Sequence, residues 1–514
     1  MKKLLIRFYS SCKKGQKKYI IKNKSLSTLR EKISKLYDQD ILSLDEKLFD
    51  IPKKKLFNQY LGQKLLYQKF IQVYFFFYEK GGRLIFPLPS KWQESLEESG
   101  TKVNKILSSI LYFLFLIYSF FLGVCLFFKI IIKYIYFNFF KKTQLSLEKI
   151  TIFRNINTSR MNLNPKIHYN LLNWYKSKID ENANIVFFSN TNKNKQYNEN
   201  LAEANSELFL FSKDFQIFKF IFLFFKSLAH FRKISLIEFN LLLFEELIEL
   251  NFYCSLKKNK IDKIIFSWTN NIFKPLWVYE LEKKGIPVSI FFNGCINEIR
   301  LNSELSFDHD HEGLRNMTWN NYYVWDVVNS EFLKQKIIKK INIKITGPNF
   351  FSDNDKNFEL PKKSVVIFGY ENNKKNIGIN TITDYEYCDK NFLQRFYNDI
   401  YDLAIQNGFH VVVKRKNETG KLEFKKYKYF FNQFFLKPNT TSINANISAF
   451  RVIENASIII SMPFTSTGLI GFMFNKRSIY YDPFKWIKKG DPSGSNLPLL
   501  SGKDELESWF HNQK

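Results

Sequence analysis

The sequence predicts an α/β fold of two parallel lobes, preceded by a helical amino-terminal region that carries one long apolar segment. Three observations lead to this prediction. From about residue 150 onward, short apolar runs alternate with helical patterns, which is typical of parallel α/β lobes. The alternation pauses at 347–363, a stretch with two prolines, one glycine and little apolar periodicity. An uncharged apolar run, Ile106–Phe128, comes before both lobes.

Composition limits the classes of protein to consider. The 514 residues are 45% hydrophobic and 18% aromatic, which is enough to bury more than one core and excludes a disordered chain. The formal net charge of +29 favours phosphate-bearing partners, namely nucleic acid, anionic lipid or a nucleotide-linked substrate. No basic cluster with interleaved aromatic residues forms a recognised nucleic-acid module, so we expect no nucleic-acid partner.

The cysteines and the amino terminus indicate a reducing compartment. Five cysteines are widely spaced and form no CxxC pair: Cys12, Cys125, Cys254, Cys295 and Cys388. This pattern favours neither a zinc site nor a disulfide framework, and we expect no bound metal. The first apolar run ends at Arg7 after three residues, which is too short for the core of a secretory signal.

The first 142 residues divide into a basic helical region, 1–100, and a hydrophobic, membrane-associated segment, 101–142. Apolar residues recur near helical spacing in the first part, at Leu61, Leu65, Leu66, Phe70 and Val73. In the second part, Ile106–Phe128 has 23 residues without a charged side chain. At about 1.5 Å per residue, this length covers a hydrocarbon core of roughly 30 Å.

Three arrangements of this segment are open: a spanning helix, a re-entrant or interfacial element, and a buried core helix. The length makes the core helix the least favoured of the three. Lysines lie on both sides, so charge asymmetry does not set a topology: Lys91, Lys102 and Lys105 before, and Lys129, Lys133, Lys141 and Lys142 after. Gly123 near the middle also suits a segment that enters and leaves by one face.

The first lobe is predicted at 150–346. Lys263–Ser267 and Val288–Phe292 are predicted strands, and the helix predicted between them, Lys274–Lys284, completes one βαβ unit. Further strands are expected at Tyr322–Trp325 and Lys344–Thr346. The linker is predicted at 347–363.

The second lobe is predicted at 364–510. Its expected strands are Ser364–Phe368, Phe409–Lys414, Ser457–Ser461 and Ser478–Tyr481. Helices are expected over Asn391–Gln406, which has one apolar stripe and a glycine stop at Gly408, and from Ser466.

Ligands of open parallel sheets lie outside the carboxyl ends of the strands, so residues that follow strands are the candidates for a site. Lys414, Arg415 and Lys416 follow one strand, and their cations can neutralise a diphosphate. Spacing alone favours the alternative, a solvated basic turn. Asp482 follows another strand and is either a turn former or a donor contact.

The most specific of these strand ends is the stretch Met462–Gly468, between a buried strand and a helix. It contains Pro463, Phe464, Thr465, Ser466, Thr467 and Gly468. Hydroxyl groups at a helix start can cap backbone N–H groups, or these N–H groups and the helix dipole can hold a phosphate. One hydroxyl is enough for capping, so three in a row favour anion binding. We expect the strand of Lys414 and Arg415 to end beside the strand of this turn, so that their cations approach the same anion.

The string SMPFTSTGLIG at Ser461–Gly471 resembles the bacterial polysaccharide biosynthesis proteins named for their PFTS motif. VVVKRK precedes it, and SIYYDP and a terminal LPLLSGKDELESWF follow it. More distantly, the lobe is similar to the carboxyl-terminal lobes of capsule transferases and glycerophosphotransferases, which have the two-lobed GT-B fold of Rossmann-like lobes. The resemblance covers 364–510 closely and 260–350 more loosely. It also includes Trp92 and the Phe86-Pro87-Leu88-Pro89 string before the apolar segment.

The resemblance implies a glycosyltransferase that moves a sugar or sugar-like unit from a nucleotide-activated donor to a glycan or lipid-linked acceptor, in capsule or O-antigen-like synthesis. It further implies the cytoplasmic face of the bacterial inner membrane, with no cofactor beyond the nucleotide sugar as co-substrate. The donor-binding residues would be Lys414, Arg415, Pro463, Phe464, Thr465, Ser466, Thr467, Gly468 and Asp482. Related transferases have a Pro-His pair after the lysine strand, where this chain has Arg415-Lys416-Asn417, so a mechanism assigned to that histidine does not carry over.

An inverting transferase needs a base on the first lobe to deprotonate the acceptor hydroxyl. The candidates are Glu298 and the cluster of Asp308, His309, Asp310 and His311. The cluster has no metal-site spacing, and a solvated polar loop is its alternative. Strand ends in the same lobe offer acceptor-pocket residues: Trp268, Thr269, Asn270, Asn293 and Gly294. A second hypothesis for the whole chain is a non-catalytic partner in polysaccharide assembly or export that keeps the scaffold.

Overall fold

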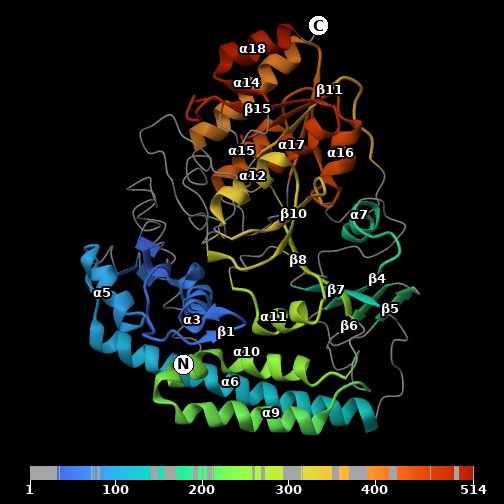
Figure 1. Ribbon diagram of the computed structural model, residues 1–514. Helices are drawn as coiled ribbons and strands as arrows, with labels where there is room; N and C mark the ends of the chain where they lie inside the picture. The colour runs from blue at the N-terminus through green and yellow to red at the C-terminus, as the bar shows by residue number, and fades with distance from the viewer. Residues whose placement is uncertain are drawn as a thin grey trace.

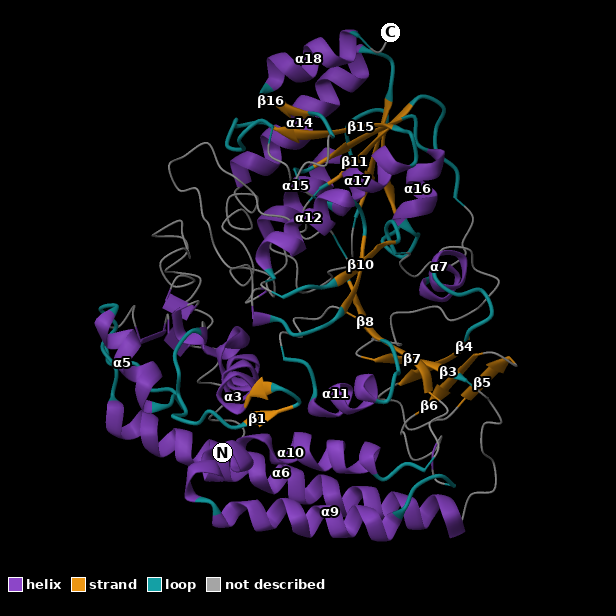
Figure 2. Cartoon of the chain, in the orientation of Figure 1, coloured by secondary structure: helices purple, strands orange, loops and turns teal. Residues whose placement is uncertain are grey.

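The computed structural model places two sheets above a layer of long helices (Figure 1). It describes residues 32–33, 35–70, 73–74, 76–77, 81–139, 149–154, 170–188, 195–198, 201–204, 211, 213–257, 261–267, 273–292, 294, 314, 316–337, 339–349, 358–369, 390–415, 425–463, 465–490 and 497–512. The carboxyl-terminal lobe lies at the end of the molecule opposite the helix layer (Figure 2).

The first lobe is built on an eight-stranded sheet in the order β10-β9-β8-β7-β3-β4-β6-β5. The strands are β3 (Ile150–Arg154), β4 (Asn184–Phe188), β5 (Lys195–Asn198), β6 (Leu201–Ala204), β7 (Ile261–Ser267), β8 (Val288–Phe291), β9 (Asn321–Val324) and β10 (Asn342–Ile345). All neighbouring pairs are parallel except β5 with β6. The lobe also contains helices α7 (Leu171–Lys178), α11 (Leu276–Lys283) and α12 (Val327–Lys336). The inner strands β3, β4, β7, β8 and β9 contribute buried residues to cores on both faces of the sheet, so they are mostly apolar runs instead of alternating patterns.

The second lobe has a six-stranded parallel sheet in the order β13-β12-β11-β14-β15-β16. The strands are β11 (Ser364–Phe368), β12 (His410–Lys414), β13 (Thr440–Ile443), β14 (Ile458–Ser461), β15 (Arg477–Asp482) and β16 (Leu499–Ser501). The helices are α14 (Lys390–Gln406), α15 (Lys425–Phe434), α16 (Ala449–Asn455), α17 (Ser466–Met473) and α18 (Lys503–His511). Numbered within the lobe, the order is the 3-2-1-4-5-6 of a Rossmann sheet. The two sheets share no strand, which confirms the predicted pair of Rossmann-like lobes.

Trp325 joins the two lobes. It follows β9 of the first lobe, and its indole N–H donates to the carbonyl oxygen of Phe292 at 3.0 Å. Its ring is buried among side chains of the second lobe, including Val366 and Phe450. Because one indole is hydrogen-bonded in one lobe and packed in the other, it limits how far the lobes can separate.

The helix layer consists of α6 (Lys105–Phe139), α9 (Ile217–Ala229) and α10 (Ile237–Cys254), with the short turns η3 (His230–Arg232) and η4 (Ile234–Leu236) before α10. Within the described part of the chain, α6 is the one helix long and apolar enough to cross a membrane by length and composition. It runs unbroken through Gly123, where an added Cβ would lie 2.5 Å from Cδ1 of Phe244 and 2.9 Å from the backbone nitrogen of Glu245. Gly123 therefore serves close packing of α6 on α10, and it does not mark the break that a re-entrant segment needs.

The amino-terminal region packs against the first lobe. It contains β1 (Lys47–Leu48), β2 (Ile51–Pro52), α3 (Lys53–Leu61), the π-helix η1 (Gly62–Phe70) and α5 (Ser90–Glu98). Its core includes Phe273, Leu276 and Tyr279 from the segment that begins α11. Gln63 accepts a hydrogen bond from the backbone N–H of Phe273 at 2.7 Å, so the region is tied to the segment just before α11.

Candidate functional site

The site is centred on the turn between β14 and α17, at the point of the second sheet where the strand order reverses. β11 and β14 are neighbours there although helices α14, α15 and α16 and strands β12 and β13, among the described elements, lie between them in the chain. In such sheets the ligand crevice lies outside the carboxyl ends of these two strands. The N–H of Met462 donates to the carbonyl oxygen of Phe368 at 3.0 Å, which fixes the two strand ends together. The PFTS turn, Pro463–Gly468, starts directly after this bond.

The hydroxyl groups of the turn do not cap α17. Thr465 precedes the helix, and its side chain makes no capping hydrogen bond. Instead, its hydroxyl donates backward to the carbonyl oxygen of Met462 at 2.8 Å and lies 3.4 Å from the hydroxyl of Thr467. Thr467 in turn lies 3.2 Å from the hydroxyl of Ser461. The capping alternative thus does not describe this turn. The N–H of Gly468 donates to the carbonyl oxygen of Thr465 at 3.2 Å, whereas the N–H groups of Ser466 and Thr467 have no acceptor among the described residues and, with the helix dipole, can hold an anion.

Two residues hold the turn rigidly on β15. An added Cβ at Gly468 would overlap the ring of Tyr480, so only glycine allows α17 to pack this closely. The Tyr480 hydroxyl donates to the carbonyl oxygen of Thr465 at 3.1 Å. Sequence reasoning missed Tyr480, although strand alternation places it on the same face as Asp482, which was a candidate. Its position predicts a supporting role for the backbone of the turn.

Ser466 faces the first lobe. A Cβ added to Gly294 would lie 3.3 Å from the Ser466 hydroxyl, and Gly294 follows β8 of the first sheet. The structure therefore brings together one predicted acceptor-pocket residue and one predicted donor-binding residue from opposite lobes. Among the residues with described positions, none forms a hydrogen bond with the Ser466 hydroxyl, which is half-buried.

Lys414 and Arg415 make contacts inside the second lobe. The Lys414 ammonium is buried and donates to the carbonyl oxygens of Arg415 at 2.6 Å and Ala445 at 3.0 Å. The Arg415 guanidinium lies over the rings of Tyr427 and Phe431. We expected the strand of Lys414 to end beside the strand of the PFTS turn, and this was wrong, because β11 lies between β12 and β14. Contact of either cation with a donor stays a prediction.

Asp482 organises a turn. Its carboxylate is fully buried and accepts hydrogen bonds from the backbone N–H groups of Phe484 at 3.1 Å and Ile487 at 2.8 Å. Burial raises the pKa of this carboxyl, and the backbone donors partly offset that rise. The turn-forming alternative describes this geometry, and a donor contact by Asp482 stays a prediction.

The remaining predicted site residues lie outside the described part of the chain. These are the base candidates Glu298, Asp308, His309, Asp310 and His311, the pocket candidates Trp268, Thr269, Asn270 and Asn293, Lys416 of the basic turn, and Phe464 of the PFTS turn. Within the described ranges, no group of three His, Cys, Asp or Glu side chains is placed to hold a metal.

Comparison with known proteins gives one family and several distant structures. The family model described as "Polysaccharide biosynthesis PFTS motif protein" matches residues 223–510, more than half of the chain. No curated protein matches. Similar solved structures include the glycotransferase of kitacinnamycin, with 10% identity, 71% of this chain and 90% of that chain covered, and a TM-score of 0.34. The UDP-GlcNAc 2-epimerase of Methanocaldococcus jannaschii, in complex with UDP-GlcNAc and UDP, has 12% identity, coverage of 71% and 91%, and a TM-score of 0.35. A UDP-glucosyltransferase from Polygonum tinctorium has 9% identity, coverage of 71% and 83%, and a TM-score of 0.34.

Proposed function

This chain belongs to the family of polysaccharide biosynthesis PFTS motif proteins, and from this premise we propose that it is a glycosyltransferase of bacterial surface polysaccharide assembly. It transfers a sugar or sugar-like unit from a nucleotide-activated donor to a glycan or lipid-linked acceptor. The product is a polysaccharide of the capsule or O-antigen type.

One observation carries this proposal. The uncapped start of α17 lies at the strand-order reversal of the second sheet and faces Gly294 of the first lobe. A helix N-terminus in that position attracts phosphate through its N–H groups and its dipole. The donor phosphates bind at the PFTS turn, and the transferred sugar lies toward the first lobe, where the acceptor binds.

The chemistry follows from this placement. An acceptor hydroxyl oxygen attacks the anomeric carbon of the donor sugar and forms a new C–O bond. The bond between that carbon and the phosphate oxygen breaks, and the nucleoside phosphate leaves with the electron pair. Its growing negative charge is stabilised by the N-terminus of α17. The acceptor proton passes to a base of the first lobe, for which Glu298, Asp308, His309 and Asp310 are the candidates.

The location we propose is the cytoplasmic face of the inner membrane. Nucleotide-activated donors are made in the cytoplasm, and a lipid-linked acceptor requires access to the membrane. The long apolar helix α6 supports membrane attachment by its length and composition.

A panel of nucleotide sugars tests the proposal. The purified protein, with a lipid-linked or glycan acceptor mixture, should release a nucleoside mono- or diphosphate from at least one donor. A folded protein that neither binds nor turns over any donor would favour the second candidate, a non-catalytic partner in assembly or export. The contacts that hold Lys414 and Arg415 inside the second lobe are the observation in favour of that candidate.

A further inference from the structure

The helix α6 is attached to the rest of the protein along its whole length. Its buried residues form one stripe at helical spacing: Ser108, Tyr112, Leu116, Ser119, Gly123, Phe127, Ile130 and Phe137. From Ser108 to Phe137 the stripe is about 44 Å long at 1.5 Å per residue. A hydrocarbon core is only about 30 Å thick. Any part of α6 long enough to cross it would therefore have protein packed along its buried stripe.

The partner helix α10 carries carboxyl groups beside the stretch of α6 from Tyr112 to Gly123. Glu238 accepts a hydrogen bond from Tyr112 of α6 at 2.6 Å, and Glu245 lies 3.6 Å from the ammonium of Lys64. The backbone of Glu245 is also the close neighbour of Gly123. A spanning α6 would carry these charged groups and the helices that bear them into the hydrocarbon, where ionised side chains are strongly disfavoured.

The opposite face of α6 is apolar and exposed. Its exposed residues include Ile106, Ile110, Phe113, Leu114, Tyr118, Phe121, Phe128, Ile132, Ile135 and Phe139. A soluble helix of this position would have a polar outer face. The exposed apolar face therefore requires a partner or a lipid surface.

The neighbouring helix α9 repeats this arrangement. Phe218, Phe222 and Phe225 form an exposed stripe, and Phe218 is 85% exposed. Lys219 and Lys226 are also exposed and lie about 90° around the helix from this stripe, at 3.6 residues per turn. An apolar face bordered by lysines is the pattern of a helix that lies in a membrane interface.

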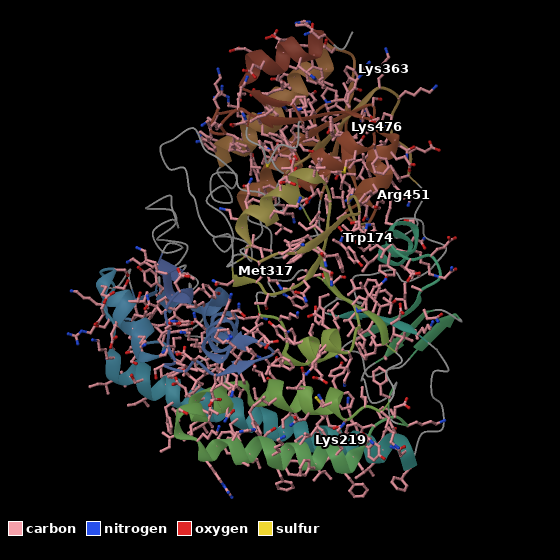
Figure 3. The ribbon with its side chains drawn as sticks, viewed as in Figure 1. Trp174, Lys219, Met317, Lys363, Arg451 and Lys476 are labelled. Atoms are coloured by element: carbon pink, nitrogen blue, oxygen red, sulfur yellow. The ribbon has the colours of Figure 1, made fainter. Side chains whose placement is uncertain are left out.

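The two helices lie side by side. The ring of Phe127 from α6 stacks on that of Phe224 from α9, with centroids 3.8 Å apart. Figure 3 shows the helix layer at the end of the molecule away from the carboxyl-terminal lobe, with Lys219 labelled on it. We call the exposed apolar residues of α6 and α9 together the platform.

We propose that the platform lies in the plane of an anionic phospholipid interface, so that α6 and α9 are immersed lengthwise and α6 does not cross the bilayer. The inference rests on the membrane location proposed above and defines how the chain attaches. Charge complementarity identifies the lipid as anionic, because exposed cations border the platform: Lys129, Lys219, Lys226 and Arg232. The in-plane arrangement also explains why lysines flank the apolar segment on both sides, since both ends of the segment stay at the same face of the membrane.

Vesicle flotation of the purified full chain tests the platform. The wild type should float with vesicles that contain phosphatidylglycerol and much less with pure phosphatidylcholine. The double variant Phe218→Glu/Phe222→Glu should lose flotation at least tenfold, whereas Leu436→Glu, an exposed apolar residue of the second lobe, should not. Lys219→Glu/Lys226→Glu should lose the preference for phosphatidylglycerol, and the matched control Lys362→Glu/Lys428→Glu should keep it.

Labelling of the two ends of α6 separates the in-plane and spanning arrangements. Lys102→Cys and Asn138→Cys place labels at exposed positions near the two ends of α6 that do not belong to the platform. Bound to sealed vesicles, both variants should react with a membrane-impermeant maleimide added outside, with the labelled peptides located by mass spectrometry. Protection of one end until detergent is added would overturn the in-plane arrangement while leaving the membrane location intact.

Two other outcomes would overturn the in-plane arrangement for different reasons. Absence of flotation for the folded wild type would overturn the membrane location together with this inference. A stable dimer that hides the platform and ignores vesicles would assign the surface to a second copy of the chain, again overturning it. Light scattering of the lipid-free protein distinguishes a monomer from such a dimer without any variant.

Discussion

Replacing the Ser466 hydroxyl should weaken donor binding without affecting the fold. The hydroxyl faces Gly294 and has no hydrogen-bond partner among the described residues. Ser466→Ala should therefore change the free energy of unfolding by roughly 0.5 kcal/mol or less. A hydrogen bond to a charged phosphate contributes about 1.5–3 kcal/mol, so the dissociation constant of the donor nucleotide should rise about 10- to 150-fold.

Thr465→Val is the matched comparison. It keeps the branched shape and removes a hydroxyl that donates to the carbonyl oxygen of Met462 at 2.8 Å. This internal bond contributes about 0.5–1.5 kcal/mol, so the variant should unfold more easily, with a smaller change in nucleotide affinity. Calorimetric titration of a nucleoside diphosphate and thermal unfolding of the three proteins separate the effects. A Ser466→Ala variant that binds nucleotide as tightly as the wild type, or that mainly lowers the melting temperature, would refute a donor contact by this hydroxyl.

Three further predictions concern stability. Gly123→Ala should lower the melting temperature, because the new methyl group would meet Phe244 at 2.5 Å, and overpacking costs about 1–3 kcal/mol; an unchanged melting temperature would contradict the close packing. Burial raises the pKa of Glu246 to about 8, so the folded chain keeps a proton that the unfolded chain releases from about pH 4.5 upward. The free energy of unfolding should therefore fall as pH rises from about 4.5 to about 8. Glu246→Gln should flatten that fall in unfolding titrations, and an equal slope in both proteins would count against a raised pKa at Glu246. Lys414→Met should be destabilised by about 1–3 kcal/mol, because the carbonyl oxygen of Ala445 loses its buried donor; a loss of nucleotide affinity at unchanged melting temperature would restore its donor-binding assignment.

The second lobe was predictable because its elements carry local signals. The strand predicted at 364–368 matches β11, and the helix predicted at Asn391–Gln406 matches α14 within one residue. An apolar stripe and the stop at Gly408, which has a positive φ of 76°, define that helix in the sequence itself. Continuous apolar runs likewise identified β12, β14 and β15, because these strands are covered on both faces.

The helix layer was harder to predict, because its residues are apolar on more than one face. α10 is packed against α6 on one side and the first lobe on the other, so no single stripe marks it. The uncharged run ends at Phe128, whereas α6 continues to Phe139, within the segment predicted at 101–142. Lys129 and Lys133 end the uncharged run without ending the helix.

The composition of the site was predictable, but its spatial order was not. Residue type and strand position were enough to select the PFTS turn, since hydroxyls and a glycine follow a buried strand. The order of strands depends on long-range pairing, and it separates Lys414 from the turn by β11. The approach of Gly294 to Ser466 depends on how the two lobes dock, for which neighbouring sequence carries no signal.

A structure of the protein with a bound nucleotide sugar, or with the nucleoside diphosphate it releases, tests the central claim most directly. We predict phosphate oxygens within hydrogen-bonding distance of the first N–H groups of α17 and of the Ser466 hydroxyl, with the sugar directed toward Gly294. A nucleotide bound with its phosphates away from the start of α17 would contradict the account.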